Sequence, residues 1–125
     1  MDRSKRLSET EYEIMEVLWK SETPMSASQI ASYFSECHNK DWKASTLATF
    51  LSRLTQKGVI NSKREGRVPY YYPIKSKEEY ERDGAQGILD LLYDGSIKNF
   101  FAALYSGTPI SKDERDSLRE WLDNQ

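Results

Sequence analysis

The stretch from Trp42 to Tyr72 constrains the fold of this chain more than any other part of its sequence. Between residues 44 and 57, apolar side chains recur at the spacing that places them on one side of a helix. Those inward positions are Leu47, Phe50, Leu51 and Leu54. Gly58 follows, and glycine is the residue that most readily adopts the left-handed conformation that ends many helices. The pattern predicts an amphipathic helix with a defined end.

A short β-hairpin is predicted directly after this helix. Residues 59–64 and 68–74 are rich in β-branched and aromatic side chains, and residues 65–67 read Glu-Gly-Arg, a turn sequence. Pro69 and Pro73 cannot donate a backbone hydrogen bond, which favours an edge position for the second strand. The hairpin is therefore expected to have two strands, the second of them at an edge.

Two further helices are predicted upstream, each opened by a serine whose side chain and backbone can exchange hydrogen bonds with the residue three positions later. The two serine pairs are Ser8 with Glu11 and Ser26 with Gln29. Apolar residues at helical spacing extend the first helix to about Lys20 and the second to about Cys37. Three helices followed by a hairpin give the order of elements of a winged helix-turn-helix.

Charge is distributed unevenly along the chain. Residues 43–75 contain seven basic side chains and one acidic one, whereas residues 1–42 and 76–125 both contain more acidic than basic side chains. The formal net charge of −2 hides this asymmetry. Because a nucleic acid meets the local field of one face, an acidic total does not exclude DNA binding.

The outer side of the predicted helix 44–57 carries short hydroxyl and amide side chains where a solvated helix more often carries Glu and Lys. Such groups match donors and acceptors on base edges, and flanking cations can hold phosphates. We therefore predict DNA contacts from this helix and from the hairpin at Ser45, Ala48, Thr49, Ser52, Arg53, Gln56, Lys63, Arg64 and Arg67. The alternative is a solvated face that happens to be low in charge.

The last fifty residues are predicted to form three helices that begin near Ser76, Ile97 and Ser111. They contain more large apolar side chains than so few residues can bury within one chain. We expect them to form a homodimer interface through Ile88, Leu91, Leu92, Ile97, Phe100, Phe101, Leu104, Tyr105, Leu118, Trp121 and Leu122. The alternative is a monomer in which these helices fold back on the winged domain.

The predicted fold class is mainly α with a small β-hairpin wing. Residues 1–75 of the 125-residue chain are expected to form a winged-helix DNA-binding domain and residues 76–125 an α-helical dimerisation domain. No run of about 18 apolar residues occurs and the N-terminus lacks the apolar stretch of a signal peptide, so we expect a cytoplasmic protein without membrane insertion.

Catalysis and metal binding have few candidate residues. Cys37 is the only cysteine and His38 the only histidine, and neighbours on a helix point about 100° apart. We therefore predict no enzyme activity, no cofactor and no metal site, and expect a buried thiol beside a surface imidazole. Two alternatives remain open, a thiol- or metal-responsive regulator and a winged domain used only for protein contacts.

Several stretches resemble the penicillinase repressor family, which includes the methicillin-resistance repressors and the repressors of copper-transport operons. They are LSETEYEIMEVLW, DWKASTLATFLSRLTQKGVI, the pair Tyr71-Tyr72, and SKDERDSLREWL. The resemblance covers nearly the whole chain. It implies a homodimeric bacterial repressor that binds a palindromic operator in double-stranded DNA and excludes RNA polymerase. Carried over to this chain, it adds Lys43 and Thr46 to the predicted DNA contacts.

The chain departs from the family pattern at Ala48, where some members have arginine. Base readout at Ala48 is either lost or replaced by an apolar contact with a thymine methyl group. In β-lactam-responsive members a membrane-bound sensor protease triggers cleavage at an Asn-Phe bond. The corresponding position here holds Ala103-Leu104, with Asn99-Phe100 four residues earlier, so the resemblance names a sensor protease as a partner without predicting cleavage. No cysteine follows Cys37, so the copper-responsive cysteine cluster is absent.

Overall fold

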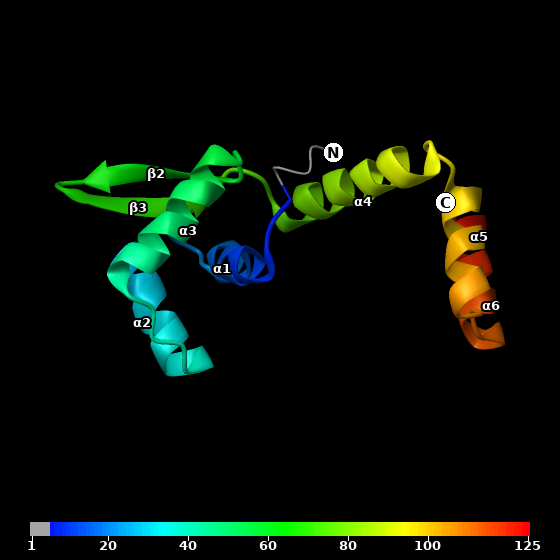
Figure 1. The fold of residues 1–125 in the computed structure, drawn as a ribbon, viewed down its shortest axis with the longest axis horizontal. Helices are drawn as coiled ribbons and strands as arrows, with labels where there is room; N and C mark the ends of the chain where they lie inside the picture. The colour runs from blue at the N-terminus through cyan, green and yellow to red at the C-terminus, as the bar shows by residue number, and fades with distance from the viewer. Residues whose placement is uncertain (1–5) are drawn as a thin grey trace. The chain divides into compact units, whose positions relative to one another are not determined.

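The computed structural model describes residues 6–125 and contains six helices and three strands within them (Figure 1). In chain order the elements are α1 (Glu9–Lys20), β1 (Met25–Ser26), α2 (Ala27–His38), α3 (Ala44–Gln56), β2 (Ile60–Glu65), β3 (Val68–Pro73), α4 (Lys77–Tyr93), α5 (Ile97–Gly107) and α6 (Lys112–Asp123). The structure thus confirms the predicted fold class, which is mainly α with a small β-hairpin wing.

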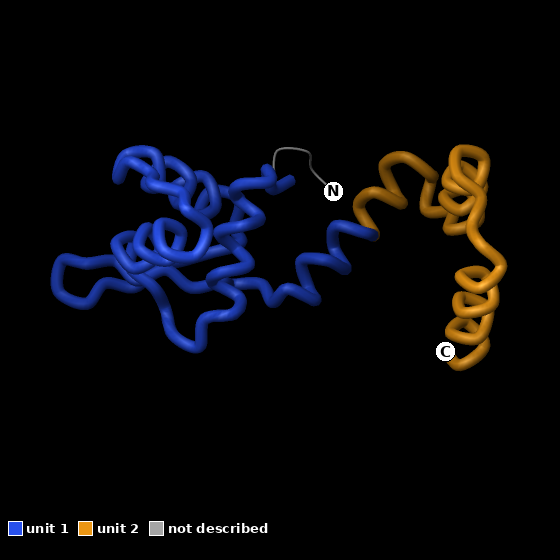
Figure 2. Tube along the Cα trace, turned by 90° about the horizontal axis from the view of Figure 1, so that it is seen from below, with its two compact units in different colours: residues 1–85 blue, residues 86–125 orange. Residues whose placement is uncertain are grey.

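The chain divides into two compact units, residues 1–85 and residues 86–125 (Figure 2). We call them the winged unit and the C-terminal unit. The division falls inside α4, so the first two turns of this helix belong to the winged unit. The functional boundary expected after residue 75 stays a prediction, because compactness does not say which residues bind DNA or a partner.

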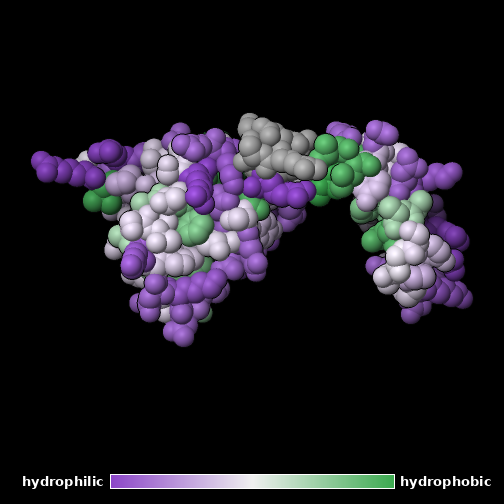
Figure 3. All heavy atoms as spheres, viewed as in Figure 1, coloured by the Kyte–Doolittle hydropathy of each residue, from purple (hydrophilic) through white to green (hydrophobic). Residues whose placement is uncertain are grey.

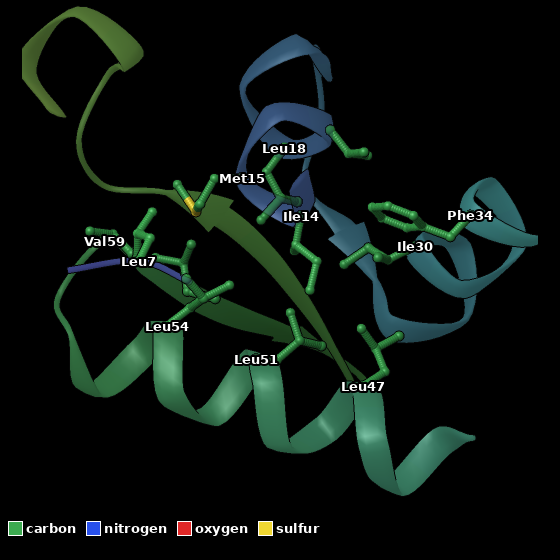
Figure 4. Packing of buried hydrophobic residues seen from close by; sticks show 12 residues of the cluster. Leu7, Ile14, Met15, Leu18, Ile30, Phe34, Leu47, Leu51, Leu54 and Val59 are labelled. Atoms are coloured by element: carbon green, nitrogen blue, oxygen red, sulfur yellow. The ribbon is translucent and has the colours of Figure 1, made fainter. Parts of the chain in front are cut away.

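The winged unit has one hydrophobic core, built from α1, α2, α3 and the start of β2, with Tyr71 of β3 and Tyr80 of α4 packed against it. Figure 4 shows three leucines of α3, namely Leu47, Leu51 and Leu54, pointing from one side of that helix towards the strands and the other helices. The remaining core side chains are Leu7, Ile14, Met15, Val17, Leu18, Ile30, Phe34, Val59 and Ile60. Burial of this set fixes which face of α3 is left for solvent or a ligand.

The predicted helix starts are confirmed in atomic detail. At α1 the Ser8 amide donates to Glu11 Oε1 (2.9 Å) and the Glu11 amide donates to Ser8 Oγ (3.2 Å). Ser26 and Gln29 repeat the same reciprocal pair at α2. Each exchange satisfies two amides that have no partner within the helix, so the starts of α1 and α2 are fixed locally. Gly58 has a φ of 77°, as predicted for the end of α3.

The sheet contains one more strand than the sequence predicts. Its order is β1-β3-β2, with both pairings antiparallel. The sequence indicates only a turn around β1, because two residues are too few for any period-2 pattern to be visible. The pairs formed by β1 are Met25 with Tyr71 and Ser26 with Tyr70. β3 is therefore the central strand, and the prediction of an edge position for it is wrong.

Pro69 and Pro73 are tolerated in the central strand because β1 is so short. The Ile74 amide donates to the Val59 carbonyl (2.9 Å), and backbone amides alternate in direction along a strand. The ring nitrogens of Pro69 and Pro73 therefore face the β1 side, beyond the two residues at which β1 pairs. The prolines remove no hydrogen bond from the sheet and prevent β1 from extending.

An aromatic cluster attaches the start of α4 to α1 within the winged unit. The Trp19 indole Nε1 donates to the carbonyl of Lys75 (2.9 Å). The Tyr80 ring lies 5.7 Å from the Trp19 ring and 6.1 Å from the Tyr12 ring, measured between centroids. Edge-on and tilted contacts at this distance are favourable for aromatic pairs. This cluster explains why α4 begins as part of the winged unit.

The C-terminal unit leaves most of its large apolar side chains exposed. Neither α5 nor α6 contains a buried residue. Figure 3 shows hydrophobic atoms, coloured green, on the surface of this unit. The large exposed apolar residues are Ile88, Leu91, Leu92, Ile97, Leu104, Tyr105, Trp121 and Leu122. Within residues 6–125, every helix is too short or too polar to span a lipid bilayer.

Candidate nucleic-acid interface

The face of α3 opposite its buried leucines carries mostly short polar side chains, together with one alanine, one glutamine and one cation. All seven side chains predicted to face DNA from this helix are exposed: Ser45, Thr46, Ala48, Thr49, Ser52, Arg53 and Gln56. Because the leucines on the other side are fully enclosed, α3 cannot rotate without opening the core. The exposed face is therefore held in one orientation by packing.

The start of α3 is positioned by aromatic stacking. The ring of Trp42 lies 4.5 Å from that of Phe34 in α2 and 5.9 Å from that of Phe50 in α3. Lys43 is the N-cap residue, and its side chain makes no capping hydrogen bond. The first amides of α3 are thus left without a side-chain acceptor, and such amides favour anions such as phosphate.

The hairpin projects its cations in two directions. Tyr71 of β3 packs against the core and pairs with Ser62 of β2, so this pair lies on the inner face of the sheet. Since side chains alternate along a strand, Arg64 shares the face of Ser62 and Lys63 lies on the opposite face. Arg67 is exposed in the turn. The predicted wing residues are brought together, but Lys63 and Arg64 do not share a surface.

The cations of the basic stretch differ in whether they are neutralised. Lys57 forms an ion pair with Glu11 (2.7 Å), and Lys75 forms one with Asp83 (3.0 Å). Within residues 6–125, no carboxylate forms a salt bridge with the five cations predicted to contact DNA, which are Lys43, Arg53, Lys63, Arg64 and Arg67. The positive charge of this surface therefore comes from the residues that are predicted to contact DNA.

Lys57 has a structural role that sequence reasoning missed. Its Nζ donates to both oxygens of the Glu11 carboxylate (2.7 and 3.0 Å) and to the carbonyl of Arg6 (2.8 Å). Burial favours the neutral form of Glu11, but hydrogen bonds from Lys57 and Ser8 outweigh burial and lower the pKa of this carboxyl group. The network ties the end of α3 to the start of α1. Residues so far apart in sequence give no local signal of pairing.

The thiol is placed differently from expectation, whereas the imidazole of His38 is exposed, as predicted. Cys37 is exposed, which corrects the prediction of a buried thiol, because the apolar side of α2 ends at Phe34. The ring of His38 lies 5.1 Å from that of Phe34 and 5.7 Å from that of Tyr33. Residues 6–125 contain no group of three or more His, Cys, Asp or Glu side chains arranged to hold a metal ion.

The residues predicted for the dimer interface all belong to the C-terminal unit. Three of the eleven, Phe100, Phe101 and Leu118, are half-buried, and the other eight are exposed. The rings of Phe100 and Phe101 lie 5.5 Å apart, and Tyr93 lies 5.5 Å from Phe100. A small aromatic cluster thus joins the end of α4 to α5, with exposed leucines on either side of it.

A sequence profile described as penicillinase repressor matches residues 7–124, almost the whole chain. The chain belongs to the penicillinase repressor family. The penicillinase repressor of Bacillus licheniformis is 26% identical over 123 residues, covering 98% of this chain and 94% of that protein. The methicillin resistance regulatory protein MecI of Staphylococcus aureus (strain N315) is 23% identical over 124 residues, covering 99% of this chain and 98% of that protein.

The fold of the winged unit is also found among solved structures. The DNA-binding domain of the repressor BlaI aligns with a TM-score of 0.52 and 31% sequence identity, covering 64% of this chain and 94% of that domain. This similarity confirms the winged-helix fold. The resemblance to the penicillinase repressor family that the sequence motifs indicated is likewise confirmed.

Proposed function

We propose that this protein is a homodimeric transcriptional repressor that binds a palindromic operator in double-stranded DNA. The observation that carries the proposal is the α3 face of short polar side chains, accompanied by five cations that form no salt bridge within residues 6–125. Membership of a repressor family and similarity to a repressor's DNA-binding domain support it. The proposal involves no catalysis and places the protein in the bacterial cytoplasm, where its operator lies.

In this proposal α3 enters the major groove and the wing contacts the backbone. Ser45, Thr46, Ala48, Thr49, Ser52 and Gln56 face base edges. Lys43 and Arg53 contact phosphates beside the groove, together with the uncapped first amides of α3. On the wing, Lys63, Arg64 and Arg67 contact the backbone, and the opposite directions of Lys63 and Arg64 suit a hairpin that lies along a phosphate strand.

The exposed apolar side chains of α4, α5 and α6 support the proposed homodimer. Contiguous exposed apolar surface is unfavourable in water and is normally covered by a partner. A second copy of the chain supplies the same surface, which a two-fold axis makes self-complementary. Two copies of α3 then meet half-sites one or more helical turns apart, and linkage raises the modest affinity of each half-site.

We assign no proteolytic switch to this repressor. Ala103-Leu104, at the position where the family resemblance places an Asn-Phe cleavage site, lies inside α5, and so does Asn99-Phe100. A membrane-bound sensor protease is therefore retained only as a partner to test. Incubation of the chain with such a protease is expected to leave α5 intact, and a single cut within it, seen by mass spectrometry, would reverse this assignment.

A gel-shift titration at several salt concentrations tests the proposal. The probe is the DNA upstream of the protein's own gene. If the five cations of each protomer all contact phosphate, the slope of log affinity against log salt is about −9. Lys112→Ala, an exposed lysine of α6, serves as a control and is expected to leave the slope unchanged. The absence of a shift on any DNA would reject the proposal and favour a winged domain used for protein contacts.

A further inference from the structure

On the outer face of α3, the neighbouring residues Ala48 and Thr49 each carry a methyl group. Ala48 offers only a methyl group. The Thr49 hydroxyl donates to the carbonyl of Ser45, one turn earlier, at 3.0 Å. Both side chains are exposed, so whatever binds this face of α3 meets them directly.

The hydrogen bond of Thr49 changes what this side chain can offer a ligand. A hydroxyl has one hydrogen, and Thr49 uses it within the helix. Its Oγ1 can still accept, but it cannot donate to the acceptors that guanine, adenine and thymine present in the major groove. Within residues 6–125, no protein acceptor is found for the hydroxyls of Ser45, Thr46 and Ser52, so those three remain free to donate.

We infer that the methyl group of Thr49, with that of its neighbour Ala48 beside it, recognises the 5-methyl group of thymine in each half-site; we call these two methyl groups the methyl pair. This inference rests on the proposed function and deepens it. Thymine is the only base that presents a methyl group in the major groove, and apolar side-chain contact is the means by which proteins read it. The competing contact is an amino group of adenine or cytosine donating to Thr49 Oγ1, which does not involve the methyl group.

The first experiment selects duplexes from a random library with the full-length protein. Enrichment of thymine at a fixed position in each half-site is expected. Replacing that thymine by deoxyuridine removes only the methyl group, and affinity measured by fluorescence anisotropy is expected to fall about fourfold, the factor for removing one buried methyl group. Unchanged affinity after substitution of every thymine in turn would overturn the inference.

Two variants then separate the methyl group of Thr49 from its hydroxyl. Thr49→Val keeps the methyl group and removes the oxygen, and it is expected to retain the preference for thymine over uracil. Thr49→Ser keeps the hydroxyl and removes the methyl group, and it is expected to lose most of that preference. The reverse result would assign recognition to the hydroxyl and reject the methyl pair. Thermal unfolding of both variants checks that α3 remains folded.

The selection also distinguishes the inference from the function on which it rests. If no sequence is enriched, both the repressor proposal and the methyl pair are wrong. If a sequence is enriched but deoxyuridine has no effect, the repressor proposal stands and only the methyl pair fails. Measuring Thr49→Ser and wild type on both the thymine and the deoxyuridine duplex gives the coupling between the two methyl groups, which is expected to account for most of the fourfold effect, the remainder coming from Ala48.

Discussion

The winged unit and the C-terminal unit treat their apolar side chains in opposite ways. Both α3 and α5 have an apolar side, but α3 encloses Leu47, Leu51 and Leu54 in a core, whereas α5 contains no buried residue. The winged unit buries its apolar side chains in its own core and exposes a mostly polar face of α3. The C-terminal unit exposes most of its large apolar side chains. In the proposed function, the polar face of the first unit binds DNA and the apolar surface of the second binds a second copy of the chain.

The largest effect is expected from a charge placed on the apolar surface of the C-terminal unit. Phe101→Asp should separate the dimer into monomers, because each copy would bring a desolvated carboxylate to the interface. Loss of the second half-site should lower operator affinity by a factor on the order of 100 to 10,000. Sedimentation velocity and operator titration measure the two consequences.

Asn99→Asp is the matched control for Phe101→Asp, since it adds the same charge to an exposed position of α5. It should leave the dimer intact. A dimer that survives Phe101→Asp would show that the two copies meet elsewhere. The exposed apolar surface around Phe101 would then not be the dimer interface.

A core truncation sharpens the contrast by acting on one unit alone. Phe34 is fully buried, so Phe34→Ala is expected to cost about 3–5 kcal/mol in the free energy of unfolding of the winged unit. The loss should not depend on protein concentration. Leu92→Ala, on the exposed surface of α4, should act through the dimer, so its difference from the wild type should shrink on dilution, as both proteins become monomeric. Urea unfolding at two protein concentrations compares them.

The buried ion pair of the winged unit gives the next effect. Lys57→Met leaves the Glu11 carboxylate buried without its partner and is expected to cost about 3 kcal/mol at neutral pH. Lys40→Met breaks the more exposed pair with Glu13 and should cost under about 1 kcal/mol. Equal losses from the two variants would show that the Glu11 network does not hold α3 in place.

The same pair predicts how stability depends on pH. In the wild type the pKa of Glu11 is lowered in the folded state, so its contribution is present above the pKa of the unfolded chain and is lost as pH falls. In Lys57→Met, burial raises the pKa instead, and protonation relieves the cost. The difference in stability between wild type and Lys57→Met should therefore shrink on acidification. A constant difference would contradict this assignment.

The smallest effects are expected on the wing. Arg64→Ala and Arg67→Ala should each weaken operator and random DNA alike and reduce the salt slope by about 1 for each cation removed. Lys63→Ala tests the opposite face of the hairpin. If only one of Lys63 and Arg64 alters the salt slope, the hairpin contacts DNA with one face and does not lie along the DNA strand.

By contrast, Ser45→Ala on α3 should lower the preference for the operator over random DNA more than it lowers total DNA affinity.

Local signals in the sequence predicted most of the winged unit. Some features depend only on neighbours within one or two helical turns, so they could be recognised from the sequence alone. They are the serine caps at Ser8 and Ser26, the leucines on one side of α3, and Gly58. The strand β1 was missed because two residues carry no periodicity. The central place of β3 was misjudged because prolines at unpaired positions look the same in sequence as prolines at an edge.

The site could be predicted only as a set of residues and not as a geometry. The polar face of α3 followed from helical periodicity. The hydrogen bond of Thr49 depends on a rotamer, and the neutralisation of Lys57 depends on a carboxylate 46 residues away in sequence. Neither is visible as a pattern. Both change what this stretch offers a ligand, since the ammonium group of Lys57 is bound by Glu11 and the hydroxyl of Thr49 is bound by the carbonyl of Ser45.

The most direct test of the central claim is the mass of the complex that the full-length chain forms with its selected operator duplex, measured by sedimentation equilibrium. Two chains in the free protein and two chains on one duplex are expected, because one unit pairs the copies and the other binds DNA. A single chain that remains monomeric at micromolar concentration, and binds the duplex as a monomer with undiminished affinity, would contradict the account.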